Sequence, residues 1–140
     1  MLPHINYWAV LLATLSSMIV GSIWYTPKVF GNYWMKAAGV TVSGNSRDAV
    51  RPIITTVIVS FITAWVLAGA VFISQHFYGG GFLGNAIVTA IVLWAGFTAA
   101  RFITHDAFDQ RPTGLTVLNV AHEFVTVVIM AVLIGVWPPA

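Results

Sequence analysis

Four long apolar stretches, more than any other feature of the sequence, limit what this chain can fold into. They occupy residues 5–25, 53–73, 82–103 and 115–137. Each reaches the roughly 20 residues that an α-helix needs to cross about 30 Å of hydrocarbon. The sequence therefore predicts an all-α integral membrane protein in which four transmembrane helices form a single domain over residues 1–140.

Charged residues are too scarce for a water-soluble domain. Only 7% of the residues are Asp, Glu, Lys or Arg, whereas a soluble domain carries roughly 25%. The surface that charges leave uncovered is predicted to face lipid, so the bilayer is the first expected partner. Cysteine is absent, which excludes disulfides, a thiolate nucleophile and a thiolate metal site.

The basic residues predict the orientation of the chain. Four lie between the first two stretches and two lie around the turn between the last two: Lys28, Lys36, Arg47, Arg51, Arg101 and Arg111. All six fall on one side of the predicted membrane, and the positive-inside rule makes that side cytoplasmic. Both termini are then expected outside. Nothing basic precedes the first stretch and no A-x-A-like cleavage site follows it, so we expect a retained helix rather than a signal peptide.

The segment WYTPKVFGNYW, residues 24–34, follows the first stretch with an unusual density of aromatic rings. Such rings favour the headgroup level of a bilayer, and Pro27 cannot continue a helix. We therefore expect a short amphipathic helix near residues 28–38 along the cytoplasmic interface. The expected anchors are Trp24, Tyr25, Lys28, Phe30, Tyr33, Trp34 and Lys36. They form a passive aromatic and basic belt or, alternatively, a gating or lipid-reading element.

Two glycine-containing segments are predicted to connect spans. TVSGNSRDAVRP, residues 41–52, is rich in Gly, Ser and Asn and should form a connector that leads to Pro52 at the start of the second span. GGG at residues 79–81 should form an outer hairpin between the second and third spans.

Several residues, most of them in the first quarter, form a pattern typical of one family. They are Asn6, Gly21, Trp24, Tyr25, Pro27, Phe30, Gly31 and Trp34, together with the pair Arg111 and Pro112. In these residues the chain resembles the bacterial membrane proteins grouped as domain of unknown function 1761 (DUF1761). The resemblance implies a small multi-pass, four-helix protein, and we expect it in the bacterial cytoplasmic (inner) membrane. It implies no activity, substrate or catalytic residue.

Small residues recur at every fourth position of the first stretch. They are Ala9, Ala13, Ser17 and Gly21. On a helix they share one face, where they allow a neighbouring helix to approach closely. The next two stretches carry the stripes Thr56, Ser60, Thr63, Ala70, Ser74 and Asn85, Thr89, Gly96. We expect each stripe to face protein, where its polar groups form hydrogen bonds or else line a solute path.

The last stretch carries a polar cluster. Its members are Asn119, His122, Glu123 and Thr126. They fall within about 100° on a helical wheel, and Glu123 lies roughly 13 Å into the span. A charge at the centre of a membrane helix costs about 2.5–3.5 kcal/mol, so the carboxyl group should face the bundle interior or a wet cavity, be paired, or be protonated. The cluster is a functional site or, alternatively, a device that fixes helix register.

Arg101 is the candidate partner of this carboxylate, because it lies in the last turn of the third stretch. The alternative is that its side chain extends to the cytoplasmic headgroups. A regular helix places it about 160° from Asn85, so only one of the two should face the fourth span.

Known chemical motifs fail on spacing. HEFVT has Thr126 where a zinc-binding H-E-x-x-H motif has its second histidine. The four histidines lie at different depths, which disfavours a haem with two histidine ligands. His105, Asp106 and Asp109 are expected to balance nearby arginines and cap helix ends rather than bind a metal. We therefore expect no enzyme activity, no cofactor, no metal and no nucleic-acid partner.

Two classes of function fit these features. The first is a homo-oligomeric channel or proton-linked transporter whose path passes the cluster around Glu123. The second is a non-catalytic accessory or structural subunit of a larger membrane complex, packed through the small residues and the aromatic segment.

Overall fold

The described part of the chain is helical, with turns and loops between the helices and no strand. The computed structural model describes residues 3–41 and 46–140. Its elements are α1 (Tyr7–Trp24), α2 (Gly31–Ala38), α3 (Ser46–Tyr78), α4 (Phe82–Leu93), the π-helix η1 (Trp94–Ala99), α5 (Ala100–Phe108) and α6 (Thr113–Val136). Four segments are long and apolar enough to cross a membrane: Tyr7–Trp24, Arg47–Tyr78, Phe82–Phe108 and Thr113–Val136. The predicted helical fold with four long apolar helices is confirmed.

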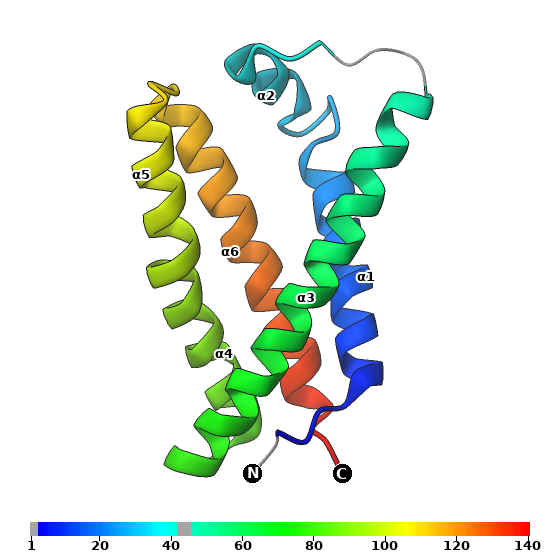
Figure 1. Ribbon diagram of the computed structural model, residues 1–140, viewed down its shortest axis with the longest axis vertical. Coiled ribbons are helices and arrows are strands. Elements are labelled where there is room, and N and C mark those ends of the chain that lie inside the picture. Colours follow the sequence, from blue (N-terminus) through cyan, green and yellow to red (C-terminus); the bar gives the residue numbers. More distant parts are fainter. Residues whose placement is uncertain (1–2, 42–45) are drawn as a thin grey trace.

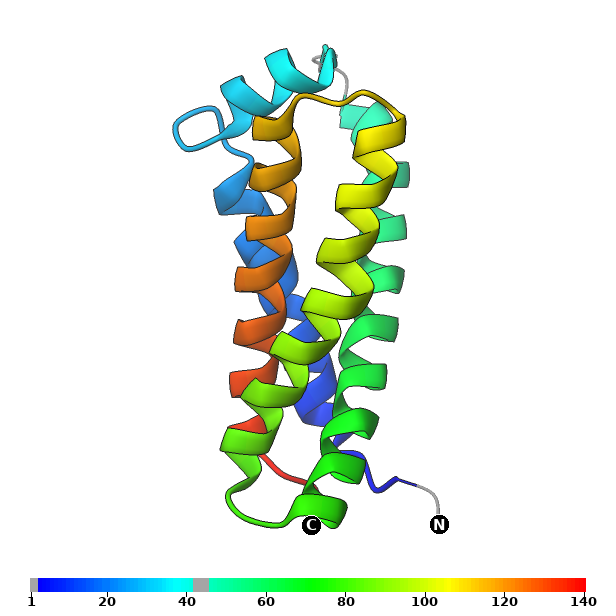
Figure 2. The ribbon, with the colours of Figure 1, turned by 90° about the vertical axis from the view of Figure 1, so that its left-hand side faces the viewer.

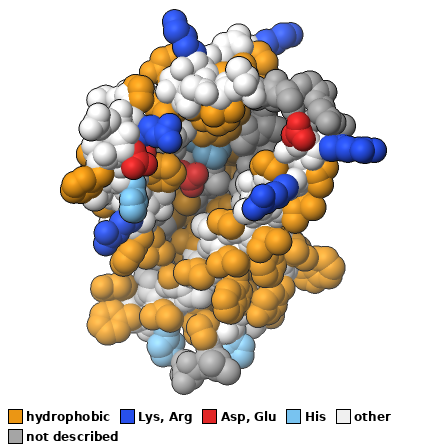
Figure 3. Space-filling model, turned by 45° about the horizontal axis from the view of Figure 1, so that its top comes forward, with side chains coloured by type: hydrophobic (Ala, Val, Ile, Leu, Met, Phe, Trp, Pro, Cys, Tyr) orange, Lys and Arg blue, Asp and Glu red, His pale blue; other side chains and the backbone are white. Residues whose placement is uncertain are grey.

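The long helices run side by side, and both chain ends lie at the same end of the bundle (Figure 1). α2 crosses the opposite end next to the start of α6, which it contacts (Figure 2). The start of α3 and the turn between α5 and α6 lie at that opposite end too. Lys and Arg side chains therefore gather there (Figure 3), so the bundle has a basic end and a terminal end.

The helices pack most tightly toward the terminal end. Val10 of α1, Val71 of α3 and Met130 of α6 are the largest fully buried side chains. Alanines surround them and keep the helices close: Ala13, Ala64, Ala68, Ala86, Ala90 and Ala131. At Gly135 an added Cβ would lie 2.9 Å from the Cα of Leu83, so only glycine allows α6 to approach α4 this closely.

Asn6 closes the terminal end of the bundle. Its side chain accepts hydrogen bonds from the backbone N–H groups of Trp8 and Ala9, which caps α1. Its amide also donates to the Trp137 carbonyl at 3.2 Å. One residue of the family pattern thus joins the first helix to the end of the last.

The second long helix begins earlier than predicted. α3 starts at Ser46 and contains Pro52 in its interior, so residues 46–52 are helical rather than a connector; residues 42–45 lie outside the described residues. Proline favours the first turn of a helix; further inside, it removes one backbone donor and its ring crowds the carbonyl group four residues earlier. Asp48 lies in the first turn, where its carboxylate interacts favourably with the helix dipole.

The third long helix contains the π-helix η1, which the sequence analysis missed. The indole of Trp94 donates to the Val120 carbonyl at 3.1 Å, and its ring packs against Phe124 with centroids 4.8 Å apart. A π-turn changes the phase of the residues that follow it. The expected stripe is therefore broken: Gly96 is exposed, while Asn85 donates to the Gly79 carbonyl at 2.6 Å in the hairpin.

Candidate functional site

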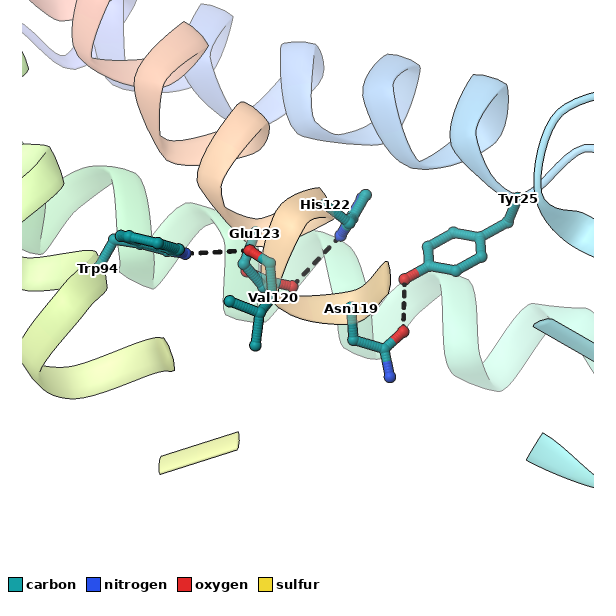
Figure 4. Close-up of polar contacts among 6 residues, drawn as sticks. All are labelled: Tyr25, Trp94, Asn119, Val120, His122 and Glu123. Carbon is teal, nitrogen blue, oxygen red and sulfur yellow. Dashed lines mark hydrogen bonds and ion pairs between the residues drawn. The ribbon is translucent and has the colours of Figure 1, made fainter. Parts of the chain in front are cut away.

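The predicted polar cluster of α6 faces α1 and α3 near the basic end of the bundle. Figure 4 shows Asn119, His122 and Glu123 together with Tyr25 from the end of α1. The Tyr25 hydroxyl donates to the Asn119 side-chain oxygen at 3.1 Å. This bond joins two segments 94 residues apart in the chain, so the cluster is the place where the end of α1 is held against α6.

His122 lies at the centre of the cluster. Its Nδ1 is 3.4 Å from a Glu123 carboxylate oxygen. Its ring contacts Tyr25 and Trp24 with centroids 5.0 and 5.8 Å apart. On the α1 side, a Cβ added to Gly21 would lie 3.7 Å from Nε2. The imidazole is thus enclosed by two aromatic rings, a carboxylate and a residue without a side chain.

A cavity of about 700 Å³ lies between α1, α3 and α6 beside this cluster. The same end of the molecule is visibly hollowed in Figure 3. α6 contributes His122, Glu123 and Thr126 to its wall, and α3 contributes both polar and apolar residues, among them Ile53, Thr56, Val59, Ser60 and Thr63. The described lining residues include one carboxylate and no Lys or Arg.

Three buried polar atoms near the cavity have no hydrogen-bond partner within the described chain: Trp24 Nε1, His122 Nε2 and Thr126 Oγ1. Thr126 is only 6% exposed. Buried polar atoms are nearly always paired, and an unpaired one requires a partner from outside the chain or a free-energy cost. His122 and Thr126 both line the cavity and lie one helical turn apart, so they could share such a partner.

Glu123 is 35% exposed, and its described ion-pair contact is with the neighbouring His122. Arg101, the other predicted partner, is exposed on α5 and does not line the cavity. The carboxyl group therefore faces a cavity rather than an arginine.

The aromatic anchors fold back onto the site. Trp24 packs against Phe30 with centroids 4.8 Å apart, and Tyr25 packs against Trp34 at 5.6 Å. The helix itself begins at Gly31 rather than near residue 28, and Phe30 is its N-cap. The chain must turn sharply to achieve this, because a Cβ at Gly31 would lie 2.3 Å from the Tyr25 carbonyl oxygen.

The remaining anchors lie at the basic end. Lys28 and Lys36 are exposed. The Tyr33 hydroxyl lies over the start of α6, where a Cβ on Gly114 would come within 2.0 Å of it. α2 therefore packs directly against the start of α6, the helix that carries the cluster.

The small residues of α1 divide between the two halves of the bundle. Ala9, Ala13 and Ser17 are buried, and α1 makes its contacts with α3 and α6. Ser17 and Gly21 also line the cavity. The face that could have received a partner protein is occupied by helices of the same chain.

The other ionisable residues lie elsewhere. At the turn between α5 and α6, which is predicted to be cytoplasmic, the Thr116 hydroxyl donates to an Asp106 carboxylate oxygen at 2.6 Å. This bond joins α5 to α6. His4 and His76 both contact Phe72 at the terminal end. Among the described residues, no group of three His, Cys, Asp or Glu side chains could hold a metal ion.

Comparisons with known proteins address the family and leave the activity open. Residues 8–135 match the model of a family described as protein of unknown function (DUF1761). Neither a curated protein nor a solved structure matches the chain. The match spans most of the chain, including every residue of the α6 cluster.

Proposed function

The chain belongs to the DUF1761 family of proteins of unknown function, and from its site we propose a proton-linked membrane carrier that binds a small solute beside Glu123. The single observation that carries this proposal is an ionisable carboxyl group in a cavity of about 700 Å³ at one end of a bundle of apolar helices. Such a group within a membrane span is costly and typically marks a transport path.

The shape of the bundle favours a carrier over a channel formed by one chain. The cavity occupies the basic half and ends at Met130, whereas the buried side chains of Val10 and Val71 fill the terminal half. A channel needs a continuous path. A carrier instead opens to one side at a time, and a bundle with a polar cavity in its basic half and a closely packed core in its terminal half has the form of one such state.

The contacts of Glu123 support coupling to protons. A carboxyl group within reach of a solute, and beside an imidazole, can exchange its proton for that solute. His122 is placed to stabilise the ionised carboxylate through its Nδ1. The proton and the solute would then use the same site in turn.

The charge distribution gives the proposed orientation. With the basic end cytoplasmic and both termini outside, the cavity opens toward the cytoplasm of a bacterium. A homo-oligomer remains our expectation, although the cavity is formed within one chain. The accessory-subunit alternative has less support, because the small residues of α1 and the rings near Tyr25 already contact helices and rings of their own chain.

Purified protein in liposomes tests this proposal. An imposed pH gradient should dissipate when a transported solute is added from a panel of small amines, carboxylates and neutral compounds. Glu123→Gln should abolish that response, while Asp109→Asn, which removes a carboxylate outside the cavity, should retain it. If wild-type liposomes hold the gradient with every solute between about pH 5 and 8, the carrier proposal is wrong.

A further inference from the structure

We infer that the cavity binds a protonated organic amine with an apolar body, and that this amine displaces the proton of Glu123. This inference rests on the proposed function in one respect: it uses the same cavity and the same carboxyl group. It adds the chemical class of the solute, which the arrangement of charge, hydrogen-bonding atoms and apolar surface in the cavity indicates.

The charges of the lining favour a cation. Glu123 is the one carboxylate among the described lining residues, and none of them is Lys or Arg. The titratable groups that face it are His122 on α6 and Tyr25 at the end of α1, and α3 adds hydroxyl groups but no titratable side chain. An anionic solute would meet an uncompensated like charge, whereas an ammonium group would pair with the carboxylate.

Two of the three unpartnered atoms, those of the cavity-lining residues His122 and Thr126, favour a donor of hydrogen bonds; the third, Trp24 Nε1, is itself a donor and does not belong to a lining residue. Once Glu123 is ionised, its carboxylate can only accept, so in that state the His122 Nδ1 at 3.4 Å from it carries the proton. In a neutral imidazole Nε2 is then an acceptor, and Nε2 has no partner. The Thr126 hydroxyl, one turn further along α6, has no partner either, and its oxygen can accept a hydrogen bond. An ammonium group supplies up to three N–H donors to a wall of acceptors.

The apolar part of the cavity wall and the volume of the cavity favour an organic cation over a bare inorganic one. Six apolar side chains from three helices line the cavity: Met18, Pro52, Ile53, Val59, Val127 and Met130. Its volume of about 700 Å³ falls within the roughly 300–1,000 Å³ of pockets that hold organic ligands. The Tyr25 ring at the mouth offers a further apolar and cation-binding face.

The proton balance follows from this arrangement. The amine enters as R–NH₃⁺, the protonated Glu123 carboxyl group releases one proton to water, and the carboxylate pairs with the ammonium group. No covalent bond to the solute forms or breaks. Because proton and ammonium compete for one carboxylate, amine binding should weaken as the pH falls and the carboxylate takes up a proton.

Binding to purified protein in lipid nanodiscs tests the inference, with empty nanodiscs subtracted. The probe is 2-(1-naphthyl)ethylamine, compared with the alcohol, the carboxylic acid and the N,N,N-trimethylammonium compound that share its ring. We expect saturable binding of the primary amine with release of one proton. The trimethylammonium compound should bind about tenfold more weakly because it lacks N–H donors. Saturable binding of the alcohol or acid with equal affinity would overturn the inference.

Two substitutions locate the binding. Glu123→Gln should weaken amine binding at least about tenfold and abolish proton release, while Asp109→Asn should change neither. Thr126→Val keeps the shape of the side chain and removes one acceptor, so it should weaken the amine but not the trimethylammonium compound. This second variant tests the inference even if Glu123→Gln fails to fold. Equal amine affinity in wild-type protein and Thr126→Val would contradict the proposed acceptor wall.

Binding and flux separate this inference from the proposed function. Amine binding that depends on Glu123 without any flux in liposomes would support the solute class and contradict the carrier. Proton-linked flux of carboxylates or neutral solutes without amine binding would support the carrier and overturn the solute class.

Discussion

The terminal and basic halves of the bundle use the same four helices in opposite ways. In the terminal half, alanines and Gly135 let the helices touch, and Met130 is only 1% exposed. In the basic half, α1, α3 and α6 separate around a cavity, and Ile53 on its wall is 51% exposed. The unpartnered polar atoms His122 Nε2 and Thr126 Oγ1 lie beside this cavity.

The difference shows how a small bundle can be both stable and hollow. Close packing holds helices together in lipid, where burial of apolar surface between helices adds little. Here that packing is concentrated at one end. The other end is held by α2, through the seat of Tyr33 on Gly114, and by the bond between Tyr25 and Asn119. The cavity therefore lies between the packed core and the aromatic residues at the basic end, here called the aromatic cover: Trp24, Tyr25, Phe30, Tyr33 and Trp34.

The largest expected difference between the two ends is their accessibility from outside the cell, because they should lie on opposite sides of the membrane. The chain contains no cysteine, so single cysteines can report exposure. Tyr78→Cys at the terminal end and Phe108→Cys at the basic end replace two exposed residues. In intact cells a membrane-impermeant maleimide should label the first and leave the second unlabelled until the cells are lysed. The opposite pattern would invert the proposed orientation and turn the cavity outward.

A second contrast concerns stability. Met130→Ala removes a fully buried side chain where the cavity meets the packed half and should lower the free energy of unfolding by about 2–5 kcal/mol. Ile53→Ala, on the cavity wall of the other half, should cost much less because its side chain is already half exposed. Reversible unfolding in mixed micelles, followed by tryptophan fluorescence, measures both. Equal losses would mean that the cavity is closed in the folded protein.

A third contrast lies within α1, where two small residues are one turn apart. Ser17→Leu places a large side chain on a buried face and should destabilise the protein by about 1–3 kcal/mol. Gly21→Leu extends from the wall of the cavity, because Gly21 lines it and an added Cβ would lie at ordinary contact distance, 3.7 Å, from His122 Nε2. We expect it to fold with near-normal stability, fill the cavity and block amine binding. Thermal unfolding and the nanodisc binding assay separate the two effects; normal binding in Gly21→Leu would exclude this region as the site.

The smallest expected effect tests the aromatic cover. Tyr25→Phe keeps the ring contacts with Trp34 and His122 but removes the hydroxyl that binds Asn119. Side-chain hydrogen bonds between membrane helices contribute about 0.6 kcal/mol on average, so the midpoint of unfolding should fall only slightly. Tyr25→Ala, which also removes the ring, should cost more. If the two variants lose the same stability, the ring contacts contribute nothing.

The sequence by itself determined the features that depend on local pattern. Hydropathy and length located four long helices, and the spacing of Asn119, His122, Glu123 and Thr126 placed them on one face of the last helix. The distribution of Lys and Arg predicted one basic end. These predictions need only the periodicity and length of a helix, which each segment carries alone.

Only the tertiary structure decided what this face meets. The contact of His122 with Trp24 and Tyr25, the choice of a cavity rather than Arg101 for Glu123, and the π-turn at Trp94 depend on neighbours distant in the chain. A helical wheel gives the direction of a side chain but not the helix opposite it, and a π-turn shifts the wheel without a mark in composition. The partners of a polar group within a bundle are set by packing, because packing decides which faces come together and where space is left.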